Sequence, residues 1–129
     1  MTRRDFIDTL ATLFGLIALP LAAQAEPAPR RLIQQCPLAG FQHHDGDALW
    51  NYLTVGDNLQ LSREPGNPHD ANAIRVDWNG RELGYIPLTQ NQTTARLIDQ
   101  GKCLEARIGG LEKHGNPWRR VSIEVWLVG

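Results

Sequence analysis

The sequence predicts a mostly β fold, a small antiparallel β-barrel of about six strands with one main helix and a short helical turn, preceded by an N-terminal signal segment. Three observations predict it. Short segments that alternate apolar and polar residues recur along the chain. Asn79-Gly80 separates two of them, which is typical of a type I′ hairpin. One stretch, residues 89–100, has helical periodicity and is followed by Gly101 as a C-cap.

The strands follow from alternation and from the turn-forming residues between them. They are expected at residues 32–43, 59–63, 73–78, 81–86, 103–111 and 120–128. The first is irregular because Pro37 and Gly40 interrupt it. Between the first two strands, residues 48–53 are expected to form the short helical turn, with Asp47 as its N-cap. The helix over residues 89–100 then connects the hairpin to the last two strands.

The first 25 residues are expected to be an export signal. Arg3-Arg4 precedes an apolar run in a context that resembles the twin-arginine motif, and Ala23-Gln24-Ala25 fits a cleavage site. Pro20 interrupts this run, which is also short for a membrane span. An ordinary secretory signal and an uncleaved anchor are the alternatives. Either export route makes the mature protein periplasmic or secreted, without a stable membrane span after cleavage.

After the signal, residues 26–35 read as a linker with polyproline character, and residues 36–129 as the single folded domain. The chain has a net charge of −1, and residues 1–25 carry two arginines and two aspartates, so cleavage leaves it unchanged. A general nucleic-acid binder usually has a strong positive balance, because neutralised phosphates supply most of its affinity. A global positive field therefore does not attract the ligand.

The two cysteines, Cys36 and Cys103, both lie in the mature part. Export favours a disulfide between them, which would close most of the domain and stabilise it by ~4 kcal/mol on the chain-entropy model. Two separate thiols are the alternative. A zinc site would need more ligands at cysteine–histidine spacing.

The stretch Arg63–Val76 reads R-E-P-G-N-P-H-D-A-N-A-I-R-V and contains the densest set of turn formers in the chain. Pro65 and Pro68 fix their own φ angles, while Asn67 and Asp70 can bond nearby backbone through their side chains. These constraints predict a loop with one conformation between two strands, and such loops commonly carry binding sites. A well-made connection without a ligand is the other interpretation.

This stretch resembles the HIRAN domain family, in which a strand, an acidic-Pro pair, Asn-Pro, an aromatic-Asp pair and A-I-x-V occur in this order. Leu83-Gly84-Tyr85-Ile86-Pro87, then Asn91 and Ala95-Arg96-Leu97, continue the family pattern. The resemblance extends over about residues 36–128. It implies a compact β-barrel with helical insertions that holds the 3′ end of single-stranded DNA in a pocket.

Carried over by position, the resemblance implies a nucleic-acid-binding site in which bases stack on rings and an aspartate meets the terminal hydroxyl. Its members are Gln42, His43, His44, His69, Asp70, Tyr85 and Trp118. Gln42 stands where the family often has a basic residue, and histidines replace tyrosines. Imidazole offers a smaller stacking surface, and it becomes cationic below about pH 6.5. Arg63, Arg75, Arg96, Arg119 and Arg120 are either local positive charge or members of ordinary ion pairs.

No catalytic or ATP-binding motif is present, so the protein is expected to be a non-enzyme without a cofactor. Hydrolase activity or zinc in the family would belong to neighbouring domains. A metal site built from His43 or His44 with His69 and Asp70 is a less favoured interpretation. The alternative function is an envelope interaction module that binds a peptide, a glycan or a partner protein, with Trp50, Tyr52 and Trp78 as contact aromatics.

Overall fold

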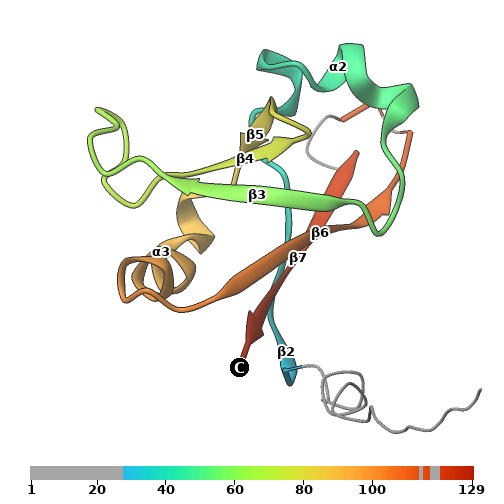
Figure 1. Ribbon diagram of the computed structural model, residues 1–129. Coiled ribbons are helices and arrows are strands. Elements are labelled where there is room, and N and C mark those ends of the chain that lie inside the picture. Colours follow the sequence, from blue (N-terminus) through green and yellow to red (C-terminus); the bar gives the residue numbers. More distant parts are fainter. Residues whose placement is uncertain (1–27, 114, 117–119) are drawn as a thin grey trace, which may run out of the picture.

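The computed structural model describes residues 28–113, 115–116 and 120–129 (Figure 1). These residues form one antiparallel sheet in the order β2-β7-β6-β3-β4-β5. The strands are β2 (Arg30–Pro37), β3 (Asn58–Arg63), β4 (Ile74–Trp78), β5 (Arg81–Tyr85), β6 (Leu104–Leu111) and β7 (Val121–Val128). The mostly β fold with about six strands and one main helix is thus confirmed. The expected signal, residues 1–25, lies outside the described residues.

The helical elements are short. They are η2 (Phe41–His43), α2 (Gly46–Leu49), η3 (Trp50–Tyr52), η4 (Leu88–Gln90) and α3 (Gln92–Asp99). The helical turn expected at residues 48–53 begins earlier, with Asp45 rather than Asp47 at its N-cap position. In the part of the chain that the structure describes, no helix is long and apolar enough to cross a membrane.

The sheet is not closed, so the prediction of a barrel is wrong. β2 and β5 are the two edges, and among the described residues a single isolated bridge, between Ala39 and Tyr85 with two hydrogen bonds of 2.9 Å, joins the segment after β2 to β5. Two residues explain why this ladder does not extend. Pro37 ends β2 without an N–H to donate, and Gly40, with a φ of 74°, turns the chain into η2. The expected strand at residues 32–43 is therefore shorter.

The β4–β5 hairpin is as predicted. Asn79 and Gly80 have φ angles of 47° and 79°, the positive pair that a type I′ turn requires. The strands around the turn pair from Trp78 and Arg81 to Arg75 and Tyr85. This register places Tyr85 at the end of the hairpin that lies beside the loop between β3 and β4 (Figure 1).

The main helix α3 begins at Gln92, later than expected, because residues 88–90 form the 3₁₀ turn η4. Its C-terminal end agrees with the prediction. Gly101 has a φ of 78°, and the N–H groups of Gly101 and Lys102 donate to the carbonyls of Ile98 and Leu97. This is the Schellman pattern, which satisfies the last helical carbonyls.

The core lies on one face of the curled sheet. Alternate residues of β6 and β7 are buried, namely Ala106, Ile108, Val121, Ile123 and Val125. They pack with apolar residues of the other strands and with Phe41. Trp50 meets Phe41 edge-on, with ring centroids 5.9 Å apart, so α2 and η3 are attached to the same core.

The predicted disulfide is also wrong, since Cys36 and Cys103 are both free. Cys36 pairs with Ile123 across β2 and β7, whereas the carbonyl of Cys103 accepts a hydrogen bond from Val128. The offset of five residues along β7 is roughly 16 Å at about 3.3 Å per residue. A disulfide needs Cα atoms within about 7 Å, and β7 lies between the two cysteines.

This arrangement predicts unequal thiol reactivity. Cys36 is buried, and burial raises the pKa of its thiol to about 11, whereas Cys103 is exposed. Because the thiolate is the reactive form, a chromogenic thiol reagent at pH 8 should modify one cysteine in the native protein and two after unfolding. Cys103→Ser should abolish the native reaction. A protein that yields no thiol even when unfolded without reductant would contradict the assignment.

Candidate nucleic-acid interface

The loop between β3 and β4, residues 64–73, is held by hydrogen bonds to itself. Oδ1 of Asn67 accepts the N–H of His69 at 2.8 Å, and Oδ1 of Asp70 accepts the N–H of Asn72 at 2.9 Å. Both are Asx turns, in which the side-chain oxygen of one residue accepts the backbone N–H of the residue two positions later. A backbone hydrogen bond from the N–H of Glu64 to the carbonyl of Ala73 closes the base of the loop. The residues that predicted a constrained loop supply these bonds.

Asp70 is fixed at both carboxylate oxygens. Its second oxygen, Oδ2, accepts a hydrogen bond of 2.6 Å from Nδ2 of Asn91, which precedes α3 and is only 1% exposed. The bond therefore ties the loop to the start of the helix. A carboxylate has about four lone-pair positions, so each oxygen can still accept another hydrogen bond.

Tyr85 approaches the loop from the end of β5. Its hydroxyl donates to Oε1 of Glu64 at 2.8 Å, and Nδ2 of Asn67 donates to the same oxygen at 3.2 Å. Burial and the Glu64 carboxylate raise the pKa of Tyr85 to about 12. The phenol is therefore neutral at physiological pH. The hydrogen bond from its hydroxyl to Glu64 holds the ring in place.

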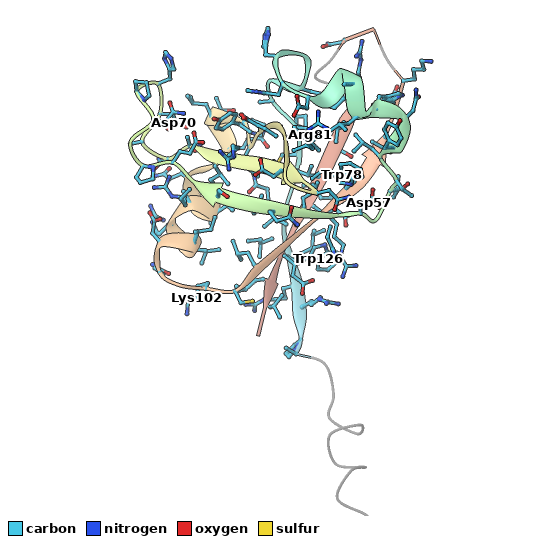
Figure 2. All side chains as sticks on the ribbon, turned by 45° about the horizontal axis from the view of Figure 1, so that its top comes forward. Asp57, Asp70, Trp78, Arg81, Lys102 and Trp126 are labelled. Atoms are coloured by element: carbon cyan, nitrogen blue, oxygen red, sulfur yellow. The ribbon has the colours of Figure 1, made fainter. Side chains whose placement is uncertain are left out.

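These groups surround a hollow of about 320 Å³, called the Tyr85 pocket below. It is lined by Ala39, Asn67, His69, Asp70, Ala73, Tyr85, Ile86 and Leu88. Figure 2 shows Asp70 on the loop that follows β3, at one end of the molecule. Leu88, which is 61% exposed, borders the pocket. The lining combines apolar and ring surface with a few polar groups from the loop, as small-ligand sites commonly do.

The structure brings together part of the predicted site. His69, Asp70 and Tyr85 line the pocket, and the ring of His44 lies 5.7 Å from that of Tyr85. His43 is exposed and does not line the pocket. Gln42 belongs to η2, where only its backbone is described, and Trp118 lies outside the described residues.

The sequence analysis missed several residues that line the pocket or support it from outside. Asn67 carries a local signal, because it belongs to the Asn-Pro pair of the motif and its side chain builds the turn at His69. Asn91 belonged to the family pattern, but only the fold shows its contact with Asp70. Leu88 has no sequence signal, since an isolated leucine in a short turn is usually an ordinary surface residue.

Two of the five arginines expected to supply local positive charge, Arg63 and Arg75, are engaged by carboxylates. Arg63 forms two hydrogen bonds with the carboxylate of Asp99 and a third with the carbonyl of Ala73. Arg75 lies 3.1 Å from Asp77 and 3.6 Å from Glu64. No arginine or lysine is among the described residues that line the Tyr85 pocket. The pocket therefore suits a neutral group better than a phosphate.

The less favoured metal interpretation finds no support in the geometry. Across residues 28–113, 115–116 and 120–129, no three His, Cys, Asp or Glu side chains are grouped to hold an ion. Instead, Nδ1 of His44 lies 3.1 Å from a carboxylate oxygen of Glu82.

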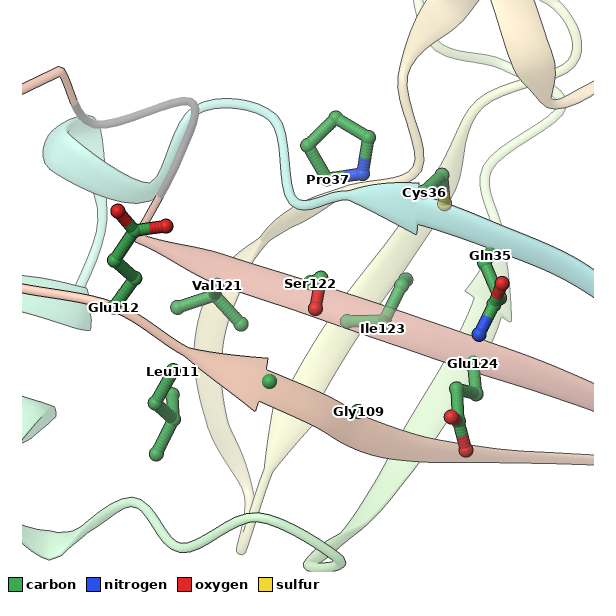
Figure 3. A pocket seen from close by; sticks show the side chains of 11 residues that line it. Gln35, Cys36, Pro37, Gly109, Leu111, Glu112, Val121, Ser122, Ile123 and Glu124 are labelled. Atoms are coloured by element: carbon green, nitrogen blue, oxygen red, sulfur yellow. The ribbon is translucent and has the colours of Figure 1, made fainter. Parts of the chain in front are cut away.

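A larger hollow of about 560 Å³ crosses β2, β7 and β6 (Figure 3). Gly109 and Gly110 leave β6 without side chains there, and the side chains of Glu124 and Ser122 lie over them. The carboxylates of Glu112 and Glu124 also line it. Two carboxylates in one groove repel phosphate, so this hollow is a poor site for nucleic acid.

The comparisons with known proteins agree with the fold and with the loop motif. The model of the HIRAN domain family matches residues 33–128. The chain belongs to the HIRAN domain family. HIRAN domains are single-stranded DNA-binding modules, and the domain is not catalytic by itself.

Two crystal structures resemble this HIRAN domain. One is a structural-genomics target from Lactobacillus plantarum, with 31% sequence identity, a TM-score of 0.66, and coverage of 77% of this chain and 95% of that chain. The other is the HIRAN domain of human HLTF, with 18% identity, a TM-score of 0.55, and coverage of 76% of each chain. The second similarity concerns the fold alone. No curated protein sequence matches this chain.

Proposed function

We propose that this HIRAN domain binds single-stranded DNA by holding its 3′ end in the Tyr85 pocket. The observation that carries the proposal is the convergence of His69, Asp70 and Tyr85 on one hollow, with Asp70 fixed by two donors. The terminal base stacks on the rings of Tyr85 and His69, which is worth about 1–3 kcal/mol per base. The carboxylate of Asp70 accepts the hydrogen bond of the terminal hydroxyl.

The same geometry selects a free 3′ hydroxyl over a 3′ phosphate. The carboxylate of Asp70 lines the pocket, and that of Glu64 lies behind Tyr85. A terminal phosphate would meet these negative charges without a lining cation, whereas a hydroxyl donates to the carboxylate. Selection at the end therefore rests on hydrogen bonding and charge repulsion.

This function concerns the domain matched by the family model. Export by residues 1–25 is a separate proposal, because that segment lies outside the described residues. Export would determine which DNA the domain encounters, but it would not alter the chemistry of the Tyr85 pocket.

The test is a titration of the full chain with a short fluorescent single strand that ends in a 3′ hydroxyl or a 3′ phosphate. Asp70→Asn removes the charge at nearly constant shape and should weaken binding of the hydroxyl strand about 10–100-fold, as expected for a hydrogen bond to a charged group. It should also reduce the discrimination against the phosphate.

Asp57→Asn is the matched control. Asp57 likewise accepts two hydrogen bonds, from the N–H of Thr54 and Nε1 of Trp78, and it lies at the opposite end of β3 (Figure 2). It should bind both strands as the unchanged protein does. Equal affinity of the unchanged protein for the two strand ends, or no effect of Asp70→Asn, would contradict the proposed function.

A further inference from the structure

A second groove, of about 260 Å³, lies along α3 and is called the Arg96 groove here. It is lined by Asn72, Gln92, Arg96, Asp99 and Gln100. Gln92 and Arg96 are four residues apart and share one face of α3, and Gln100, four residues further, is the C-cap of the helix. A guanidinium between carboxamides presents N–H donors of the kind that bind phosphate oxygens.

Arg96 is the cationic residue that lines this groove, and its guanidinium forms no ion pair with a described carboxylate. Its side chain is exposed and has no ion pair or hydrogen-bond partner among the described residues. This distinguishes it from Arg63 and Arg75, whose guanidinium groups contact carboxylates. An exposed guanidinium can bind a phosphate without first breaking an internal ion pair.

The carboxylate that lines the groove does not cancel this charge. Both oxygens of Asp99 are engaged by Arg63, at 3.0 Å and 3.1 Å. The Arg63–Asp99 pair is neutral as a unit, so Arg96 leaves the groove with a net positive charge. This is the opposite of the Tyr85 pocket, whose charged lining residue is Asp70.

The Tyr85 pocket and the Arg96 groove are lined by residues that lie close together in the chain. Asp70 lines the Tyr85 pocket, and Asn72, two residues later, lines the Arg96 groove. Asn91 bonds Asp70, and the next residue, Gln92, lines the groove. Two residues span at most about 7 Å, so the chain from Asp70 to Asn72 and the Asp70–Asn91 bond keep parts of the two linings close together.

We propose that the Arg96 groove binds a backbone phosphate of the strand whose 3′ end occupies the Tyr85 pocket. The inference rests on the proposed function and adds the path of the strand, which leaves the pocket over Asp70 and Asn72 toward α3. The pocket supplies the contact with the end, and Arg96 supplies the charge contact that the pocket lacks. An overall net charge of −1 is compatible with this local contact.

The test compares Arg96→Gln with Arg31→Gln in the full chain. Arg31 is also exposed, but it lies near the start of β2, far from the loop between β3 and β4 (Figure 1). Affinity for the strand with a free 3′ hydroxyl is measured over a range of salt concentrations. For single strands, each neutralised phosphate makes the slope of log K against log salt more negative by about 0.7.

Arg96→Gln should make this slope less negative by about 0.7, whereas Arg31→Gln should leave it unchanged. A strand whose linkages near the 3′ end are neutral methylphosphonates should bind the unchanged protein and the Arg96→Gln variant alike. The preference for a 3′ hydroxyl over a 3′ phosphate should persist in Arg96→Gln, because that preference belongs to Asp70.

The outcomes separate the two proposals. If binding depends on Asp70 and the free end but Arg96→Gln behaves as Arg31→Gln does, the phosphate site is overturned and the end pocket stands. If binding depends on Arg96 but not on Asp70 or the free end, the end pocket and the strand path that starts from it are overturned, and Arg96 is a phosphate contact independent of the strand end. A strand that does not bind under any condition overturns both.

Discussion

Replacing Gly84 with alanine will destabilise the domain by about 3 kcal/mol or more. A Cβ at this position would lie on the carbonyl oxygen of Ala39 and within 3.1 Å of the side chain of Leu38. Ordinary overpacking in a core costs about 1–3 kcal/mol, because neighbouring side chains can relieve the clash by changing rotamer. Here the obstacle is backbone that already forms the two hydrogen bonds of the Ala39–Tyr85 bridge, so relief requires opening the bridge.

Urea unfolding of Gly84→Ala measures this cost, and Gly66→Ala is its control. Gly66 lies in the loop between β3 and β4 with an ordinary φ angle, and no atom lies within 4 Å of the place that its Cβ would occupy. It should change the free energy of unfolding by no more than about 0.5 kcal/mol. Equal stabilities of the two variants would show that the bridge tolerates a side chain at residue 84.

Gly84→Ala should also weaken binding of single-stranded DNA in conditions where the variant remains folded. Ala39 and Tyr85 both line the Tyr85 pocket, so separating their backbones displaces two of its walls. The bridge is therefore a structural support of the pocket as well as a link between the segments that follow β2 and β5.

The elements that sequence predicted well are those determined by neighbouring residues. Alternation in β6 and β7 depends on the two-residue period of a strand, and the Asn79-Gly80 turn depends on two positive φ angles. The end of α3 at Gly101 follows the same logic. In each case the residues that produce the signal also form the structure.

The two wrong predictions concern contacts between distant parts of the chain. Closure of the barrel required β2 and β5 to pair, and their approach stops at one bridge because of Pro37 and Gly40. The disulfide required Cys36 and Cys103 to lie at the same level of the sheet, and the register of β7 with its two neighbours shows that they do not. Alternation reports which face of a strand is buried, but it does not report which strand lies beside it.

In the candidate site, too, the residues of a local motif were predicted, whereas the contacts between distant residues were not. His69 and Asp70 belong to one local motif, and the resemblance placed Tyr85 with them. Their supports come from residues 64 and 91, and the engagement of Arg63 by Asp99 comes from 36 residues away. Sequence therefore indicated the groups that would contact a ligand better than the groups that hold them.

Asn91→Ala will test the most important of these supports. Asn91 is buried beside the carboxylate of Asp70, and hydrogen bonds to charged groups contribute about 1.5–3 kcal/mol. We therefore expect the free energy of unfolding to fall by about 2 kcal/mol. The exposed neighbour Gln92 provides the control, because Gln92→Ala should change stability by no more than about 0.5 kcal/mol.

A double-mutant cycle of Asn91→Ala and Asp70→Ala then isolates the bond itself. Because each single variant already breaks the contact, the two losses should fail to add by about 1.5–3 kcal/mol. Asn91→Ala should also weaken binding of the free 3′ end, although it leaves the carboxylate in place, because Asp70 then loses the donor that orients it. Losses that add within about 0.5 kcal/mol would mean that Asp70 is held mainly by its own loop, through the N–H of Asn72. Orientation of the carboxylate would then be a property of the motif alone, independent of α3.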